Sequence, residues 1–329
     1  MENSNSRPLV VVWRVTELCN LGCRFCGYSR HLRWPRQAAH PEQVLAFGAL
    51  LRDYQAESGR DVLVSWLGGE PLLWPPLMEL SHTFKQEFKL HLGVTTNGTR
   101  LDSARIRERI VNDYDQITIS LDGVEDWHDS YRDAPGLYAR LGATIRKLRQ
   151  ARADTGHGPL IRVSTILTRE NLAGFEALCR DCAAWGVEEL TFNPLGGQSR
   201  PDFYAGHCLL PEHISWFVQE LPRLREQMAQ MGLKICGGQD YSNRIVSSIR
   251  GIPVPVADCK PGVQFLFIDE RGLVGPCSFT LHRYGYPLAG FKSVQDLVRL
   301  PARLAERKRS EMLTPCRDCL STQVFGKFA

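Results

Sequence analysis

The alternation of strand-like and helix-like segments predicts an α/β fold, in which helices cover a parallel β-sheet. Two observations support this prediction. Short apolar runs of strand length recur over the first two hundred residues, and amphipathic stretches with apolar residues at helical spacing lie between them. Together they form six β–α units, which is fewer than the eight of a closed barrel. We therefore expect a sheet that does not close on itself.

The six predicted strands are short segments that are apolar or alternate between apolar and polar residues. They span residues 9–13, 62–67, 90–96, 116–121, 160–167 and 189–195. Two of the intervening segments show a clear apolar helix face: Val44, Phe47, Leu51 and Tyr54 in one, and Leu137, Leu141, Ile145 and Leu148 in the other.

The last third of the chain has a different pattern. After a predicted helix at 211–231, the segments become short and rich in Gly and Pro. Residues 264–276 predict a β-hairpin around the turn 269–272, and a helix follows at 294–309. We place a domain boundary near Gly232, which gives an α/β domain at 1–232 and a small α+β domain with a β-hairpin at 233–329.

Composition favours an ordinary globular protein. Of the 329 residues, 43% are hydrophobic, and the net charge of +4 is spread along the chain. A basic run at 299–309 contains Glu306 and is interpreted as a solvated helix face, so nucleic-acid binding is not expected. No signal peptide or membrane-spanning segment is visible, which predicts a cytoplasmic protein. In that compartment the eleven cysteines favour metal sites over disulfides.

Three cysteines directly after the first predicted strand form the motif C-x3-C-x2-C. Cys19, Cys23 and Cys26 therefore lie on the loop at its C-terminal end, where Gly22 permits a bend. Thiolates are the usual ligands of iron–sulfur clusters, and three of them would leave one iron of a cubane open. A structural zinc site or three unrelated buried thiols are the alternatives. Zinc usually takes four ligands, and no fourth Cys or His has ligand spacing here, so we favour a cluster.

With Phe25 before its last cysteine, this motif resembles the cluster loop of the radical S-adenosylmethionine (SAM) enzymes. The resemblance implies a partial (β/α)6 TIM-like barrel with its sites at the C-terminal ends of the strands. It also implies that the open iron of a [4Fe–4S] cluster binds the amino and carboxylate groups of SAM. One electron then splits SAM, and the resulting 5′-deoxyadenosyl radical abstracts a hydrogen atom from the substrate.

The ends of the later strands are similar to further family motifs, although each could be a plain turn. Gly68, Gly69, Glu70 and Pro71 resemble the segment that holds the methionyl amino group, with Glu70 fixing the turn or helping to bind the amine. The resemblance assigns the other cofactor-binding positions to Asn97, Ser120, Asp122, Ser164 and Asn193. We expect 128–132 to be a loop that frames the pocket, or else an ordinary surface loop; Arg132 would face the ligand.

Four cysteines in the tail form a second set. Cys259 and Cys277 flank the predicted hairpin, and Cys316 and Cys319 form a C-x2-C pair. Four thiolates suit either a fully ligated [4Fe–4S] cluster or a structural zinc ion. Their spacing resembles the twitch domain, a shortened SPASM domain, which implies one auxiliary [4Fe–4S] cluster in addition to the catalytic one.

The remaining four cysteines lie outside both sets. Cys179 and Cys182 fall in the predicted helix at 175–185 and are expected to face the core. Cys208 and Cys236 fall in loop-like stretches. Each is interpreted as a buried structural thiol, with donation of a hydrogen atom to a substrate radical as the alternative.

The resemblance predicts a radical SAM enzyme of the oxidoreductase type. Its substrate would be a natural-product small molecule or a peptide, and its electron donor a flavodoxin or ferredoxin. We favour an oxidative step, dehydrogenation or bond formation, because a fully ligated second cluster has no open iron and suits an electron acceptor. The alternatives are a redox-neutral epimerase that uses Cys208 or Cys236, and a non-catalytic iron–sulfur protein for sensing or electron transfer.

Overall fold

The structure, a computed structural model, describes residues 7–328. Its centre is a curved sheet of ten strands in the order β10-β9-β8-β1-β2-β3-β4-β5-β6-β7. All neighbours from β8 through β1 to β7 pair in parallel, whereas β8–β9 and β9–β10 are antiparallel. The two ends of this order do not pair with each other, so the barrel is partial, as the sequence predicts.

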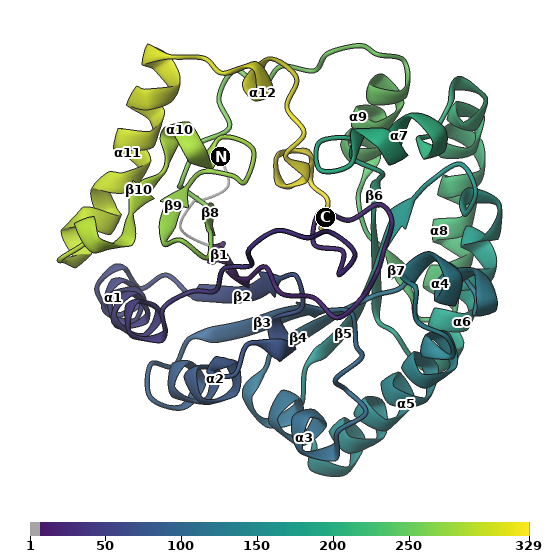
Figure 1. The fold of residues 1–329 in the computed structure, drawn as a ribbon, viewed down its shortest axis with the longest axis horizontal. Helices are drawn as coiled ribbons and strands as arrows, with labels where there is room; N and C mark the ends of the chain where they lie inside the picture. The colour runs from purple at the N-terminus through teal and green to yellow at the C-terminus, as the bar shows by residue number, and fades with distance from the viewer. Residues whose placement is uncertain (1–6, 329) are drawn as a thin grey trace.

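Helices lie on the outer side of the sheet, and Figure 1 shows them as an almost continuous outer layer from α1 to α8. The strands are β1 (Leu9–Thr16), β2 (Val62–Gly68), β3 (His91–Thr96), β4 (Gln116–Ser120), β5 (Leu160–Leu167), β6 (Glu189–Pro194), β7 (Lys234–Ile235), β8 (Phe265–Ile268), β9 (Leu273–Gly275) and β10 (Tyr286–Pro287). The main helices are α1 (Pro41–Ser58), α2 (Leu77–Gln86), α3 (Ala104–Asp113), α4 (Glu125–Arg132), α5 (Leu137–Thr155), α6 (Phe175–Trp185), α7 (Pro201–His207), α8 (Leu221–Gln230), α9 (Gln239–Ile249), α10 (Leu281–Tyr284), α11 (Val294–Ser310) and α12 (Thr314–Arg317).

Among residues 7–328, no helix combines the length and apolar character that crossing a lipid bilayer requires.

The outer and inner faces of the strands differ in burial. Trp13 and Trp66 point outward and are fully buried, with Trp13 packed edge-on against Phe47 of α1 and Trp66 against Phe84 of α2. Side chains alternate across a strand, so their neighbours point inward. These inner residues are only half-buried, and many are polar: Arg14, Ser65, Thr118, Ser120 and Ser164. The interior of the partial barrel can therefore receive a polar ligand.

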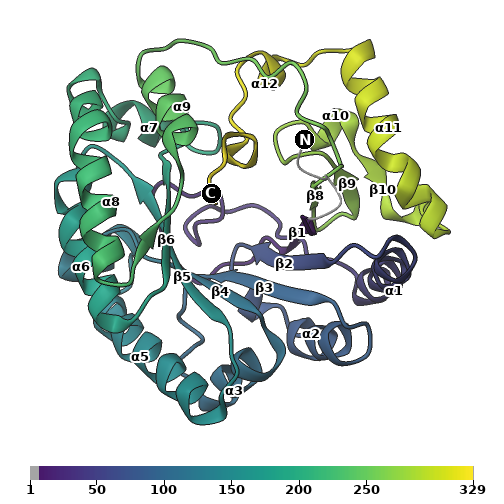
Figure 2. The ribbon, with the colours of Figure 1, turned by 180° about the vertical axis from the view of Figure 1, so that it is seen from behind.

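The predicted hairpin is confirmed as β8 and β9, but it is not a separate layer. Val10 to Trp13 of β1 pair in parallel with Phe265 to Ile268, so β8 extends the barrel sheet. The segment after α11 then crosses from the β8–β10 side of the sheet to the α9 side (Figures 1 and 2). The predicted boundary at Gly232 lies between α8 and β7, and the division into two domains stays a prediction.

Three local predictions are wrong. Residues 128–132 are not a loop but the end of α4. The first turn of this helix carries Glu125 and Asp126, and its last turn carries Arg132. Acidic residues at the start of a helix and basic residues at its end interact favourably with the helix dipole. The helix predicted at 211–231 is interrupted by a π-helical turn, Trp216–Glu220, before Pro222, which lacks the backbone donor that a regular turn would need. The basic run at 299–309 is not entirely solvated, because Lys308 is buried.

Candidate active site

The loop that carries the first three cysteines leaves the C-terminal end of β1. Its sulfur atoms face hydrogen-bond donors: Asn97 Nδ2 lies 3.7 Å from Cys19 Sγ, and the backbone N of Tyr28 lies 3.3 Å from Cys26 Sγ. Burial raises the pKa of the Cys23 thiol to about 12, and nearby Cys26 and Cys19 act in the same direction. Thiols this close to one another lose their protons readily only when a cation compensates the resulting negative charge, as in a metal cluster. The buried Cys23, together with the half-buried Cys19 and Cys26 whose sulfur atoms face donors, fits such a group.

Gly22 is required by close packing of this loop. A Cβ atom at this position would collide with the Asp133 carboxylate and with the His31 ring. Asp133 follows α4; its Oδ2 accepts from Arg30 at 2.5 Å and pairs with His31 Nε2 at 2.9 Å. The loop is therefore held against the end of α4, which is a closer constraint than the bend that the sequence suggested.

The glycines after β2 approach the backbone of the same loop. A Cβ at Gly68 would lie 2.6 Å from the Thr16 carbonyl oxygen, and one at Gly69 would lie 2.5 Å from that of Leu18. Gly69 N donates to Thr16 O at 2.7 Å, and Glu70 N donates to Leu18 O at 2.8 Å. The sequence predicts that a ligand approaches these two glycines. On the side where a Cβ atom would point, the chain itself fills that space. Both glycines are needed so that β2 can dock against the residues leading to Cys19.

Glu70 joins the ends of β2 and β3. Its buried carboxylate accepts from the backbone N of Leu72 at 3.0 Å, from Thr96 Oγ1 at 2.7 Å and from the backbone N of Asn97 at 2.6 Å. Burial raises its pKa to about 7, although these donors oppose the shift. Of its two predicted roles, fixing the turn is the one these contacts describe. Pro71 begins the buried 3₁₀ turn Pro71–Leu73 that Glu70 caps.

Asn97 continues this connection from β3 to the cysteine loop. Besides the contact with Cys19, its Nδ2 donates to Asn20 Oδ1 at 3.0 Å, and its Oδ1 accepts from Thr99 N at 2.9 Å. Asn97 therefore orients the first thiol.

Asp122, at the end of β4, is buried and fully engaged by the protein. Its Oδ2 accepts from Arg132 Nε at 2.6 Å, and its Oδ1 accepts from Ile166 N at 2.8 Å. Arg132 is buried as well, so in this structure it faces Asp122 rather than open space. A direct contact of Asp122 with the cofactor stays a prediction.

Aromatic rings from α4 pack on the cysteine loop. Phe25 stacks on Tyr131 with ring centroids 4.6 Å apart, and Tyr131 stacks on Trp127 at 4.5 Å. The Arg132 guanidinium lies 5.4 Å from the Phe25 ring centroid. The aromatic residue of the C-x3-C-x2-C motif thus fixes the loop to α4.

The other predicted cofactor positions lie on the inner face of β4, β5 and β6. Ser120 and Ser164 are register neighbours, and both are half-buried. Asn193 Oδ1 accepts from Tyr241 OH at 3.1 Å. The structure thus places Ser120 and Asn193 at the C-terminal ends of β4 and β6, and Ser164 in the middle of β5, opposite Ser120. Their contact with a cofactor stays a prediction.

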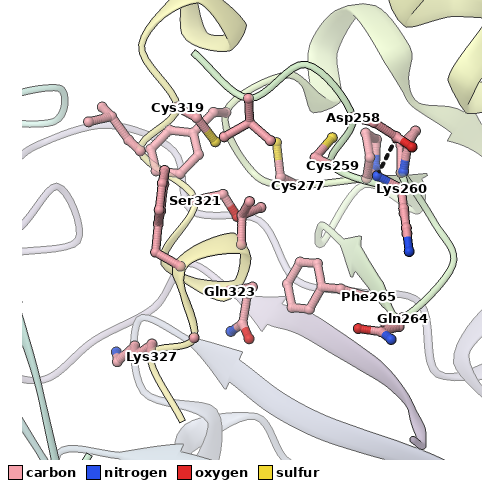
Figure 3. A pocket seen from close by; sticks show the side chains of 18 of the residues that line it. Asp258, Cys259, Lys260, Gln264, Phe265, Cys277, Cys319, Ser321, Gln323 and Lys327 are labelled. Carbon is pink, nitrogen blue, oxygen red and sulfur yellow. Dashed lines mark hydrogen bonds between the residues drawn. The ribbon is translucent and has the colours of Figure 1, made fainter. Parts of the chain in front are cut away.

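The four tail cysteines line a cavity of about 1050 Å³. Figure 3 shows Cys259, Cys277 and Cys319 together on one side, with Ser321, Gln323 and Lys327 below them. Burial raises the pKa of the Cys319 thiol, and the nearby Cys259, Cys277 and Cys316 act in the same direction. Because Cys259 precedes β8 and β9 leads back toward Cys277, this set lies at the opposite end of the β1–β8 pair from Cys19.

Hydrogen-bonding groups surround these tail thiols. Thr280 Oγ1 lies 3.3 Å from Cys277 Sγ, Tyr284 OH lies 4.0 Å from Cys316 Sγ, and Lys308 Nζ lies 3.6 Å from Cys259 Sγ. In the part of the chain that the structure describes, no three His, Cys, Asp or Glu residues are grouped as a single metal ion would require. Four thiols that line one cavity, three of them next to a hydrogen-bonding group, fit a cluster, which binds thiolates to different irons.

The remaining cysteines divide as follows. Cys179 and Cys182 are completely buried on α6, which confirms that they face the core. Cys208 is half-buried after α7, with its backbone N donating to Tyr204 O at 2.9 Å. Cys236 is buried directly after β7, and burial raises the pKa of its thiol. Hydrogen donation by Cys208 or Cys236 stays a prediction.

Comparison with known proteins identifies the family. The sequence model of the radical SAM superfamily matches residues 13–182, just over half of the chain. The chain belongs to the radical SAM superfamily. It is 25% identical over 300 residues to an AdoMet-dependent heme synthase of Oleidesulfovibrio alaskensis, covering 85% of this chain and 72% of that one. It is 23% identical over 286 residues to the mycofactocin maturase MftC of Mycobacterium tuberculosis, covering 85% and 67%.

A solved structure supports the fold of this radical SAM protein. The crystal structure of Streptococcus suis SuiB bound to S-adenosylmethionine superposes with a TM-score of 0.66 over 97% of this chain and 72% of that one, at 16% identity. Proteins of the radical SAM fold bind SAM and a [4Fe–4S] cluster. Three features of this chain's site were not found from the sequence: the Asp122–Arg132 pair, the buried Lys308 and the buried Lys327.

Proposed function

We propose that this radical SAM enzyme catalyses an oxidative tailoring step, dehydrogenation or bond formation, on a natural-product small molecule or a peptide. One observation carries the proposal: the loop that bears the three thiols is held against the ends of β2 and β3, through Gly69, Glu70 and Asn97. A bound cluster with SAM would supply a 5′-deoxyadenosyl radical at this end of the barrel. Cys19, Cys23 and Cys26 would hold that cluster, and Asn97 would orient the first of them.

The half-buried inner face would bind the remainder of SAM. Ser120 and Ser164 present hydroxyl groups toward the interior from neighbouring strands, and hydroxyls can pair with ribose or carboxylate oxygens. Asp122 would contribute indirectly, since it holds α4 and its stacked aromatic rings against the cysteine loop.

The second part of the proposal is an auxiliary [4Fe–4S] cluster on Cys259, Cys277, Cys316 and Cys319, within a twitch-like tail at 233–329. The four thiols line one cavity together, and three of them face hydrogen-bonding groups. With no open iron, such a cluster suits one-electron transfer, which an oxidation of a substrate radical requires. A flavodoxin or ferredoxin in the cytoplasm would exchange electrons with the enzyme.

Two relatives bear on the substrate class. The relatives named above are a heme synthase and a mycofactocin maturase, so the names of similar chains refer to heme and to mycofactocin. We infer a substrate large enough to reach from the SAM end of the barrel toward the cavity of the tail thiols.

The decisive experiment is anaerobic reconstitution with iron and sulfide, followed by SAM and a strong reductant. We expect about eight irons per chain and formation of 5′-deoxyadenosine. A variant with Cys19, Cys23 and Cys26 changed to Ala should keep about half of the iron and form no 5′-deoxyadenosine. Wild-type protein that binds two clusters but never cleaves SAM would instead indicate a sensor or electron-transfer protein, and zinc in the tail would exclude the second cluster.

Epimerisation is the second candidate, because Cys236 is a buried thiol next to the barrel interior. It would return a hydrogen atom to the substrate radical without net oxidation. Cys208→Ala and Cys236→Ala, assayed separately in deuterated water, distinguish the two reactions. If one variant still forms 5′-deoxyadenosine but no product, while the wild-type product carries deuterium on carbon, the oxidative proposal is wrong.

A further inference from the structure

Lys308 is a buried cation next to one of the tail thiols. It lies in the last turns of α11, and only 8% of it is exposed. Its Nζ donates to the carbonyl oxygens of Val256 at 2.9 Å and Ala257 at 3.1 Å, and it lies 3.6 Å from Cys259 Sγ. Among the residues that the structure describes, no carboxylate lies within ion-pair distance of this amine. Its third donor position is therefore directed at sulfur.

The arrangement is unusual for a lysine that only anchors a helix. Buried ammonium groups are costly unless a charge partner is present, and lysines are rarely buried without one. Two carbonyl oxygens satisfy hydrogen bonds but not the charge. A thiolate at Cys259 would supply that charge, and the carbonyl contacts would hold the ammonium at the sulfur.

A fixed positive charge next to a cluster ligand has an electronic consequence. The reduction potential of an iron–sulfur cluster depends on net charge and on hydrogen bonds to its sulfur atoms. The reduced form carries one more negative charge, so a neighbouring ammonium stabilises it more than the oxidised form. The result is a higher reduction potential.

We propose that Lys308 raises the reduction potential of the auxiliary cluster at Cys259 and thereby makes it an effective acceptor of the substrate's electron. This inference rests on the proposed function, because it requires a cluster on the tail thiols. In the electron transfer, the substrate radical loses one electron to the cluster and one proton to solvent. That electron then leaves to an external one-electron carrier of the flavodoxin or ferredoxin class.

The chain offers a matched control in the residue after Cys259. Lys260 is exposed, and Figure 3 shows its amine directed away from the thiols. Lys260→Met also removes one lysine charge near Cys259, but without removing a contact to sulfur. Lys308→Arg keeps the charge and the donors, and Lys308→Gln keeps one donor group without the charge.

The test is a reductive titration of the reconstituted full-length enzyme, followed by electron paramagnetic resonance. The Cys19/Cys23/Cys26→Ala variant identifies which signal belongs to the tail. Lys308→Met should make that cluster at least tenfold harder to reduce, about 59 mV for a one-electron couple, and leave the other cluster unchanged. Lys308→Arg should stay within tenfold of wild type, and Lys260→Met should not differ from it.

The outcomes separate the two proposals. An unchanged potential in Lys308→Met with full iron content overturns the role of Lys308 while leaving the auxiliary cluster in place. If Lys308→Met fails to hold iron, Lys308→Gln is measured in its place. An unchanged reduction potential of the tail cluster in Lys308→Gln also overturns the role of Lys308. Wild-type protein with only four irons, or with zinc in the tail, overturns the auxiliary cluster itself and this inference with it.

Discussion

Arg132 contacts the β-sheet and the cysteine loop at the same time. Its Nε donates to Asp122 Oδ2 at 2.6 Å, and its carbonyl oxygen lies 3.8 Å from Cys23 Sγ. The end of β4 is therefore connected to the middle thiol of the candidate cluster site through one residue of α4. Both charged groups are buried, so each depends on the other.

Arg132→Met should destabilise the protein by about 3–5 kcal/mol, because it leaves the Asp122 carboxylate buried without its partner. The free energy of unfolding can be measured in urea under anaerobic conditions. Arg180→Met is the control, since its ion pair with Glu176 on α6 is exposed and should contribute less than about 1 kcal/mol. Equal losses in the two variants would contradict a buried pair. Adding Asp122→Asn to Arg132→Met should recover part of the lost stability.

Glu70→Ala should be strongly destabilising even without any cofactor. It leaves the donors of Leu72, Thr96 and Asn97 buried without an acceptor, at about 1–3 kcal/mol for each. Glu70→Gln keeps one acceptor oxygen and should lose less. The same urea titration compares the two. If Glu70→Ala is as stable as wild type but binds SAM poorly, Glu70 acts on the cofactor directly and not through the turn.

Gly69→Ala should displace the residues that lead into the cysteine loop, because its Cβ would lie 2.5 Å from the Leu18 carbonyl oxygen. We expect a loss of about 1–3 kcal/mol in stability and less iron in the catalytic cluster. Gly174→Ala is the control, since a Cβ there meets no atom within 4 Å. Normal stability and iron content in Gly69→Ala would show that the loop tolerates the displacement.

Lys327 should make stability depend on pH above neutrality. Burial lowers its pKa from 10.5 to about 8, and the neighbouring Arg162 acts in the same direction, while Cys236 opposes it. Between pH 8 and 10.5 the unfolded chain holds a proton that the folded chain has lost, so this residue's contribution to stability becomes more favourable as pH rises. The full burial cost, on the order of 3 kcal/mol, applies below pH 8.

Lys327→Met removes that cost. Its stability relative to wild type should therefore be highest near pH 7 and decrease as pH rises toward 10.5. Subtracting the wild-type curve cancels the other groups that titrate in this range. Lys147→Met, at an exposed position on α5, should show a difference that does not change with pH. A flat difference for Lys327→Met would mean that its amine is hydrated in solution.

The sequence predicts the barrel strands well because they are buried apolar segments between polar ones. The prediction for 160–167 matches β5 at both ends, and the prediction for 9–13 begins where β1 begins but ends three residues too early. It could not reveal that β8 pairs with β1, because residues 10 and 265 come together only through tertiary packing. Local patterns indicate that a strand exists, but not which strand lies next to it.

In the candidate site, too, sequence patterns predicted the positions of single residues but not the contacts that depend on tertiary packing. Motif spacing brings Cys19, Glu70 and Asn97 to neighbouring strand ends, where the structure places them. Motif spacing did not show that Asp122 forms an ion pair with Arg132, because this pair depends on how α4 packs against the sheet. Lys308 left a signal that was overlooked: it follows Leu300 and Leu304 at four-residue spacing and so continues the buried stripe of α11.

The pairing of β8 with β1 also affects how the chain can be divided. Without the tail, β1 would be the exposed border of the sheet, a row of unpaired backbone groups on one of the most apolar strands. Exposed edge strands pair with those of other molecules. A chain ending at Gly232 should therefore aggregate rather than fold as a small independent unit. In this sense the tail protects the barrel from self-association, independently of any metal binding.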